Sequence, residues 1–502
     1  MEHREMAKGA LINTLGVLAR VSRALYFVIV ARLFGSEIFG FYLLTAANID
    51  IFSKIAGVGL DWGALRLTVQ LRAQGREREI RSAVYRIAGL SFSVSLCVAT
   101  IVAWVSSIIA RDLLKKEHLE KPLFYLCASI PMMTITSLLL FALRAGKKMQ
   151  YEVYVRSVVE PLVLLIGGIM AYFIYPGIEG LIGAHLLAAL SAFFLTSYFF
   201  RKFYPKDPLR TKAAIDWRGL LSYSIPMGGM DLFNVFKQRL DVMMIGRFLP
   251  FSHVAIYGAV NEIGNLVKKI RQIFEPIFMP IASHFHETDE KERLHDHFVR
   301  AMRWILLAAL ALVMPMLFAP DQFLRVFRPE FVEGSKALMF VAIGMLFYVT
   351  IGLSESVLSM TGYAYLNLIN AGVLLGINFI LHLILIPRYG IVGAGFATGI
   401  SYMVISVIRL IVTHRFVKVH PFGKSQVKPI VAGVLGLIVA WLARQLYYGS
   451  HLWTLGVVVP LFFLIYGFTL KALGLEPEDY EILERLKAKF RYLRKNLNLN
   501  GW

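Results

Sequence analysis

The sequence has few cysteines. Its 502 residues include two, Cys97 and Cys127, and each stands inside an apolar run. Folds that depend on disulfides carry larger sets of regularly spaced cysteines, and no such set occurs in this chain. This excludes a disulfide-stabilised secreted scaffold. We expect both thiols to pack as small hydrophobic groups, in lipid or at a helix contact.

The sequence also lacks the motifs of common enzymes and molecular motors. It contains no phosphate-binding loop of the form GxxxxGK[ST], no zinc-protease motif and no Ser/His/Asp signature. Two histidine pairs, at 284–286 and 295–297, stand in a polar loop where a metal site has little support. We therefore predict a protein that is not an enzyme, with no catalytic residue, no metal and no cofactor.

Charged residues are scarce for a chain of this length. They make up 17% of the sequence, whereas hydrophobic residues make up 57%. Apolar runs close to the ~20 residues that cross a bilayer recur almost to the C-terminus. The sequence therefore predicts an all-α polytopic membrane protein with about fourteen transmembrane helices. The predicted spans are residues 10–33, 38–63, 85–110, 122–143, 152–175, 178–200, 219–245, 253–281, 299–319, 337–360, 366–386, 391–414, 428–447 and 452–470.

Basic residues outnumber acidic ones by 53 to 33, which gives a net charge of +20. In a soluble protein such an excess would suggest nucleic acid. Here the Lys and Arg gather in alternate connections between the apolar runs, with the connection 111–121 as an exception. The positive-inside rule places those connections in the cytoplasm. We predict a multi-pass protein of the cell membrane (inner or plasma), with both termini cytoplasmic and no nucleic-acid partner.

Parts of the chain repeat at a spacing of about 215 residues. Arg32 and Tyr42 recur as Arg247 and Tyr257, and Lys54 recurs as Lys269. Internal repeats of this kind are typical of secondary transporters. We predict a first lobe over 1–200, a cytoplasmic linker over 201–217 and a second lobe over 218–415. Two extra helices over 416–470 and a basic amphipathic tail over 471–502 follow; the tail would lie on the membrane or in solvent.

Ionisable residues persist inside the predicted spans, although each costs about 2.5–3.5 kcal/mol to insert into a bilayer. Such groups face protein or water, so we expect them to line an aqueous cavity between the lobes. The candidate substrate-binding cations are Arg20, Arg23, Lys54, Arg156, Lys237, Arg239 and Lys269. The candidate coupling or structural acids are Asp50, Asp61, Glu160, Asp231, Asp241, Glu262 and Glu355.

Buried Lys and Arg suit a substrate that carries phosphate, because charge-assisted hydrogen bonds offset the loss of hydration. The acids would keep the empty cavity close to neutral, and they could exchange protons or bind a cation. A structural alternative remains open, in which each charge pairs along its own helix. In that case Asp50 would pair with Lys54, and Glu160 with Arg156.

The stretch from Ala31 to Tyr42, with Arg32, Gly35 and Phe39-Gly40, resembles the turn after the first helix of Wzx-type polysaccharide flippases. These proteins belong to the multidrug/oligosaccharidyl-lipid/polysaccharide (MOP) exporter superfamily. The basic run at 144–148 is similar as well, and the resemblance covers residues 10–415. It implies two six-helix lobes that open alternately to each side of the membrane. It also implies transport of a polyprenyl-(pyro)phosphate-linked oligosaccharide from the cytoplasmic to the outer leaflet, for surface polysaccharide or glycan assembly.

Three alternatives stay open. Fourteen spans and the Arg20 and Arg23 helix resemble, more loosely, the lipid II flippases of the MurJ type. The chain could also be a cation-coupled multidrug exporter of the same superfamily, whose cavity would need acidic and aromatic side chains to bind cationic drugs. A non-transporting scaffold could assist a glycosyltransferase. The expected partners are the lipid-linked oligosaccharide, membrane lipids, and a glycan polymerase or glycosyltransferases. The energy for transport would come from the membrane voltage, or from protons that Glu262 or Asp50 binds and releases.

Overall fold

The computed structural model describes residues 2–205, 214–446, 453–474, 476 and 479, with the side chains of all of these except 2–24 and 113. Helices account for all regular secondary structure in this part of the chain. The first half holds α1 (Glu2–Gly57), α2 (Leu60–Ala73), η1 (Glu77–Glu79), α3 (Ile80–Trp104), α4 (Ser106–Ile108), η2 (Ile109–Leu113), η3 (Glu117–Leu119), α5 (Glu120–Leu126), α6 (Ser129–Ala145), α7 (Gln150–Glu152), η4 (Val153–Val159), α8 (Glu160–Ile174), α9 (Ile178–Phe203) and α10 (Trp217–Phe248). The second half holds α11 (Phe251–Glu287), α12 (Lys291–Phe318), α13 (Pro320–Arg325), η5 (Pro329–Gly334), α14 (Ser335–Thr350), α15 (Leu353–Met360), α16 (Ala364–Val417), η6 (Lys424–Gln426), α17 (Val427–Leu446), η7 (Thr454–Val458) and α19 (Val459–Ala472).

The predicted class, an all-α membrane protein, is confirmed. Nine helices of the described chain are long and apolar enough to cross a membrane, or ten if one pair bent by 46° counts as a single span. Two of them, α1 and α16, each cover two of the predicted spans. Gly35 and Gly390 interrupt these helices with φ angles of 78° and 59°, a region that glycine enters without steric cost. The helices are thus consistent with the predicted fourteen spans.

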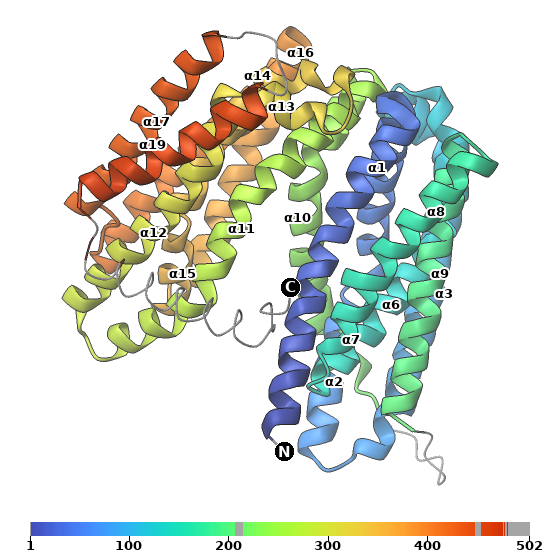
Figure 1. Ribbon diagram of the computed structural model, residues 1–502. Helices are drawn as coiled ribbons and strands as arrows, with labels where there is room; N and C mark the ends of the chain where they lie inside the picture. Colours follow the sequence, from blue (N-terminus) through green and yellow to red (C-terminus); the bar gives the residue numbers. More distant parts are fainter. Residues whose placement is uncertain (1, 206–213, 447–452, 475, 477–478, 480–502) are drawn as a thin grey trace, which may run out of the picture. The chain divides into compact units, whose positions relative to one another are not determined.

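Contacts divide the chain into two compact units. Unit 1 consists of Met1–Glu262, Leu324–Ala337 and Phe379–Ala394, and unit 2 consists of Ile263–Phe323, Leu338–Asn378 and Gly395–Trp502. These units follow contacts rather than the sequence repeat, so the predicted lobe boundaries stay a prediction. In unit 1, α1 packs against α8 and α10 (Figure 1).

Each unit has its own apolar core. The core of unit 1 gathers α2, α3, α6 and α9, with Leu60, Ile87 and Phe200 among its buried side chains. The core of unit 2 includes a cluster in which the ring of Phe318 of α12 lies 5.7 Å from that of Phe462 of α19, measured between centroids. The predicted extra helices α17 and α19 are therefore part of a packed unit. Of the two free cysteines, Cys127 is buried and Cys97 is exposed.

The sequence repeat is visible in unit 1 as two matching tyrosine contacts. Tyr42 shares a hydrogen bond of 2.9 Å with Nδ1 of His185 in α9. Tyr257 donates a hydrogen bond of 3.4 Å to the carbonyl oxygen of Ala394 in α16. Both tyrosines are buried, and both contacted helical segments begin at the repeated glycine stretches near 177 and 390. The two halves of the sequence thus place corresponding tyrosines against helical segments that begin at corresponding glycine stretches, although the bonded atoms differ.

Position 40, just after the Gly35 turn, has room only for glycine. A Cβ atom there would lie 1.8 Å from the carbonyl oxygen of Phe251, at the start of α11. The ring of Phe41 stacks on that of Phe251, with centroids 4.4 Å apart. At Gly40 and Phe41, the Ala31–Tyr42 segment therefore packs closely against the start of α11.

Candidate functional site

Unit 1 contains a polar cavity of about 320 Å³, within the size range of small-molecule sites. Helices α1, α2, α3, α6, α8, α9 and α10 and the π-helical turn η4 contribute to its wall. The cavity therefore joins helices of the first repeat to α10, the first helix of the second. Its charged lining residues are Asp50, Lys54, Asp61, Arg156, Glu160, Asp231 and Arg239.

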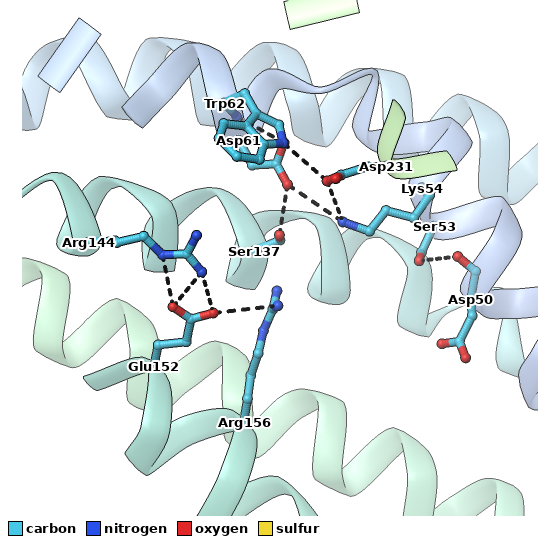
Figure 2. A network of polar contacts seen from close by, with 10 residues as sticks. All are labelled: Asp50, Ser53, Lys54, Asp61, Trp62, Ser137, Arg144, Glu152, Arg156 and Asp231. Atoms are coloured by element: carbon cyan, nitrogen blue, oxygen red, sulfur yellow. Dashed lines mark hydrogen bonds and ion pairs between the residues drawn. The ribbon is translucent and has the colours of Figure 1, made fainter. Parts of the chain in front are cut away.

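Lys54 is the centre of one polar network in this cavity (Figure 2). Its Nζ lies 3.3 Å from Oδ2 of Asp231 and 3.8 Å from Oδ2 of Asp61. Asp61 also accepts a hydrogen bond of 2.9 Å from the hydroxyl of Ser137. Asp231 accepts one of 3.2 Å from the indole of Trp62. The cation is thus held by two carboxylates, and a neutral donor fixes each carboxylate.

A break between α1 and α2 brings these groups together. Val58 and Gly59 have φ angles of 47° and 71°, which end α1 one turn after Lys54 and restart the chain as α2. Asp61 then falls in the first turn of α2, where the helix dipole favours a negative charge. Gly228 of α10 packs directly on this break, because a Cβ atom there would lie 2.5 Å from the Gly59 nitrogen. That approach places Asp231, one turn further along α10, next to Lys54.

A second ion pair joins α1 to α10. Nη2 of Arg239 lies 2.5 Å from Oδ2 of Asp50, and both side chains keep about a quarter to a third of their surface exposed. The alternative pairing of Asp50 with Lys54 along one helix is therefore not the arrangement found. Asp50 and Lys54 of α1 pair with residues of other helices instead.

Arg156 enters the cavity from η4. Its Nη1 lies 3.9 Å from Oε1 of Glu152 (Figure 2). Glu152 is also held by Arg144, whose Nη2 lies 2.7 Å from each carboxylate oxygen. Arg156 is 38% exposed and shares this partner with a better-placed arginine, so it is the more available of the two cations. Arg144 comes from the basic run at 144–148 whose similarity to flippases the sequence shows.

The charged residues of the lining nearly balance. Three of them are cations, Lys54, Arg156 and Arg239, and four are acids. Because the cations are about 28–38% exposed, they are hydrated as well as paired. An arriving anion would compete with carboxylates in water, which costs far less than breaking a dry ion pair.

The structure places the other predicted residues elsewhere. Asp241 lies beside the fully buried His382, with Oδ1 and Nε2 3.7 Å apart. Glu355 pairs with two arginines in unit 2. Among the described lining residues of the cavity, Lys237, Glu262 and Lys269 do not occur. The side chains of Arg20 and Arg23 lie outside the described part of the chain.

The partners of Glu355 are Arg271 and Arg409, two arginines that are not among the site residues predicted from the sequence. A signal for each was present in the sequence. Arg271 stands two residues after the predicted Lys269, and Arg409 is an arginine within the predicted span 391–414. An arginine inside a span is by itself a reason to expect a functional or paired group.

Polar contacts also gather around the Gly35 turn of unit 1. Nε of Arg32 donates to the carbonyl oxygen of Val326 at 2.7 Å, and the amide of Ser36 donates to Glu330 at 2.7 Å. Nε2 of His253, at the start of α11, lies 3.0 Å from Glu333. The helical rise separates this turn from Lys54 by about 27 Å along α1. These contacts hold the turn, α11 and the 324–337 segment together at one end of the unit.

The chain is similar to known membrane proteins in sequence and in fold. The family model described as polysaccharide biosynthesis protein matches residues 6–286. Over 228 residues the chain is 28% identical to the probable low-salt glycan biosynthesis flippase Agl15 of Haloferax volcanii, which covers 43% of this chain and 48% of that protein. The chain thus spans about half of that relative's length.

Two solved structures share the fold. The lipid II flippase MurJ in an inward closed conformation matches with a TM-score of 0.74 over 92% of this chain and 98% of that one, at 16% identity. A multidrug resistance MATE family transporter of the MOP superfamily, facing inward, matches with a TM-score of 0.63 over 80% and 94%, also at 16% identity. At such low identity the likeness shows the fold alone. With more than half of its length matched by the family model, the chain belongs to the family described as polysaccharide biosynthesis protein, in agreement with the resemblance of the Ala31–Tyr42 segment to polysaccharide flippases.

Proposed function

We propose that this protein is a flippase that carries a polyprenyl-(pyro)phosphate-linked oligosaccharide from the cytoplasmic to the outer leaflet by alternating access. The product would serve the assembly of a surface polysaccharide or glycan. The observation that carries the proposal is the cavity of unit 1, where Lys54 of the first repeat and Arg239 of the second line one hydrated space. Family membership and the flippase name of the Haloferax relative support it.

The chemistry of the cavity suits a headgroup with phosphate. Lys54 and Arg156 offer donors whose carboxylate partners sit at 3.3–3.9 Å, longer than a good charge-assisted hydrogen bond. A pyrophosphate group brings more acceptor oxygens and more charge than any one of these carboxylates. It would replace Asp231 at Lys54 and Glu152 at Arg156, while the lipid tail stays in the bilayer.

Binding and movement are coupled through the same ion pairs. Lys54–Asp231 and Asp50–Arg239 both tie α1 to α10. When the headgroup takes over the cations, these ties weaken and the bound state favours a different arrangement of the helices. In the predicted orientation, the Gly35 turn lies on the outer side of the membrane. The contacts at this turn would close the outer end of the transport path, and their opening would release the substrate outward.

Voltage and protons are both suited to drive the cycle. One charge that crosses the membrane gains about 2.3 kcal/mol per 100 mV, and protonation of Asp50 would free Arg239. The protein would act in the cell membrane with both termini in the cytoplasm. Its partners would be glycosyltransferases that act before the transfer across the membrane, or a glycan polymerase that acts after it.

A cation exporter is the second candidate, because acids outnumber cations by four to three in the lining. Against it, no aromatic side chain occurs among the described residues that line the cavity. Lipophilic cations bind best where aromatic faces accompany acids. A lipid II flippase would differ from the leading proposal only in the attached sugar and peptide.

Reconstitution in liposomes tests the proposal. The labelled substrate is a polyprenyl-pyrophosphate-linked saccharide, and its arrival in the opposite leaflet is measured over time. We expect Lys54→Ala and Arg239→Ala each to slow transfer by about tenfold or more, since hydrogen bonds to charged groups are worth about 1.5–3 kcal/mol. Lys237→Ala is the matched control, because Lys237 lies on the same helix as Arg239 and outside the lining. Wild-type transfer by the Lys54/Arg239 double variant would overturn the proposal.

A further inference from the structure

A second group of cations lies in unit 2, on helices that take no part in the cavity of unit 1. Arg271 of α11 and Arg409 of α16 are 8% and 4% exposed. Both reach the same carboxylate oxygen, Oε2 of Glu355 in α15, at 2.9 and 3.1 Å. Two buried guanidinium groups therefore share one oxygen atom. A guanidinium group can donate two parallel hydrogen bonds to two oxygens of an oxyanion, but here each group reaches only one oxygen of Glu355.

The ring of Tyr348 marks the centre of the group. The charged ends of Lys268, Arg271 and Arg409 lie 5.9, 5.7 and 4.8 Å from its centroid. The acids in contact with the two arginines are Glu355 and Glu275. Glu275 lies 3.8 Å from Arg271 and accepts a hydrogen bond from Ser356. Three cations thus stand against two carboxylates. The group carries one positive charge more than its described acids neutralise.

Several donors of the group are buried and have no hydrogen-bond partner among the described residues. They are Nε of Arg271 and both Nε and Nη1 of Arg409. The hydroxyl of Thr413, one helical turn beyond Arg409, is buried and unpartnered as well. A buried donor left without an acceptor costs the full penalty of its lost hydration, more so for a charged group. Charged donors in this state point to an acceptor that the described residues do not provide.

The backbone is interrupted at the same place. Helix α14 ends at Thr350 and α15 begins at Leu353, and the carbonyl oxygen of Gly352 between them accepts a hydrogen bond of 3.1 Å from Arg271. Interrupted spanning helices occur where the backbone faces protein or water rather than lipid, and in transporters they commonly form ligand sites. The break, the excess charge and the unpartnered donors are three separate observations of one place.

We propose that Arg271 and Arg409 form a second oxyanion site, which takes a phosphate or pyrophosphate group, and that Glu355 occupies the arginines when the anion is absent. The assignment of the natural ligand as a lipid-linked headgroup rests on the proposed function; the site itself does not. An oxyanion with several oxygens can satisfy both guanidinium forks at once, whereas Glu355 offers them one shared oxygen. Lys268 supplies further positive charge at the ring of Tyr348.

Binding of inorganic pyrophosphate to the purified full chain tests this site. The measurement is made in a Lys54→Gln/Arg156→Gln/Arg239→Gln background, which removes the three cations of the unit 1 cavity. We expect saturable binding that Arg409→Lys weakens about tenfold, because lysine keeps the charge and loses the fork. We expect Glu355→Gln to tighten binding several-fold, because it removes the competing carboxylate. A thermal melt with and without pyrophosphate shows that each variant is folded.

The two classes of result separate a ligand site from a structural ion pair. If Arg271 and Arg409 serve only to pair with Glu355, then Glu355→Gln lowers the melting temperature and pyrophosphate does not restore it. That outcome, or unaltered binding in Arg409→Lys, would overturn the proposal. Competition by polyprenyl pyrophosphate but not by phosphatidylglycerol in mixed micelles would support the transported headgroup as the source. Competition by phosphatidylglycerol alone would assign the site to bilayer lipid and overturn the link to transport.

The result is independent of the flippase assay. If the unmutated protein moves no lipid-linked saccharide in liposomes while the unit 2 site binds pyrophosphate, the proposed function is rejected and the site is kept. If the unmutated protein moves the saccharide while the variant without the unit 1 cations binds no pyrophosphate, the site is rejected and the proposed function is kept.

Discussion

The cavity of unit 1 and the arginine cluster of unit 2 use the same residue types in different states of hydration. Lys54 and Arg239 are about 30% exposed and meet acids that outnumber the cations. Arg271 and Arg409 are at most 10% exposed in their side chains, and there the cations outnumber the acids. Water weakens the pairs in the cavity, so these pairs can exchange. In the cluster, each partner is costly to lose.

Removal of the acid from each region should give the largest contrast. We expect Glu355→Ala to lower the free energy of unfolding by about 3 kcal/mol, because it removes the carboxylate that two buried arginines share. Asp50→Ala should cost about 1 kcal/mol or less, because Arg239 stays in contact with water. Thermal melts of both variants in the same detergent measure the difference. Equal losses would contradict the distinction between a hydrated and a dry site.

The close approach of α10 to the α1–α2 break is the next point at which the comparison can be tested. Gly228→Ala places a Cβ atom 2.5 Å from the Gly59 nitrogen, so the helices must separate. Overpacking of this kind costs about 1–3 kcal/mol and would move Asp231 away from Lys54. Gly229→Ala is the control, since a Cβ atom there meets no described atom within 4 Å. Loss of transfer in Gly228→Ala, with normal transfer in Gly229→Ala, is the expected result.

A double-mutant cycle measures how strongly Lys54 and Asp231 interact. We expect a coupling of about 0.5–1 kcal/mol from the unfolding of Lys54→Met, Asp231→Leu and the double variant, as for other partly exposed pairs. The same cycle on Arg409 and Glu355 should give a clearly larger value. A cavity pair as strong as the buried one would mean that no headgroup could displace Asp231 easily.

A third ion pair, outside both regions, extends the comparison to the segment after α19. Burial would raise the pKa of Asp479, but hydrogen bonds from Arg303 and Trp304 outweigh it and lower that pKa. A carboxylate with a lowered folded-state pKa contributes stability above its unfolded pKa of about 3.9 and loses it as the pH falls through the folded value. We expect about 1 kcal/mol that persists to about pH 4 and disappears below it. Asp479→Asn should remove this part of the pH dependence of the melting temperature.

Much of this architecture follows from the order of residues along the chain. The spacing of apolar runs predicts the helices, since a bilayer demands about 20 such residues whatever the neighbours are. The recurrence of Arg32, Tyr42 and Lys54 predicts two related halves, and Tyr42 and Tyr257 both contact helical segments that begin at the recurring glycine stretches. The expense of an ion in lipid predicts that Asp50, Lys54 and Asp61 face a polar space, which is where they lie.

The choice of partners was decided by tertiary structure alone. Periodicity shows which side of a helix carries a charge, but it does not show which helix that side meets. Lys54 pairs with Asp231, 177 positions away, because the break at Gly59 and the bare surface of Gly228 let α10 come close. In the same way Arg271 and Arg409 meet at Glu355 only because α11, α15 and α16 pack together at these residues. Arg271 stands 84 positions from Glu355, and no local pattern encodes that meeting.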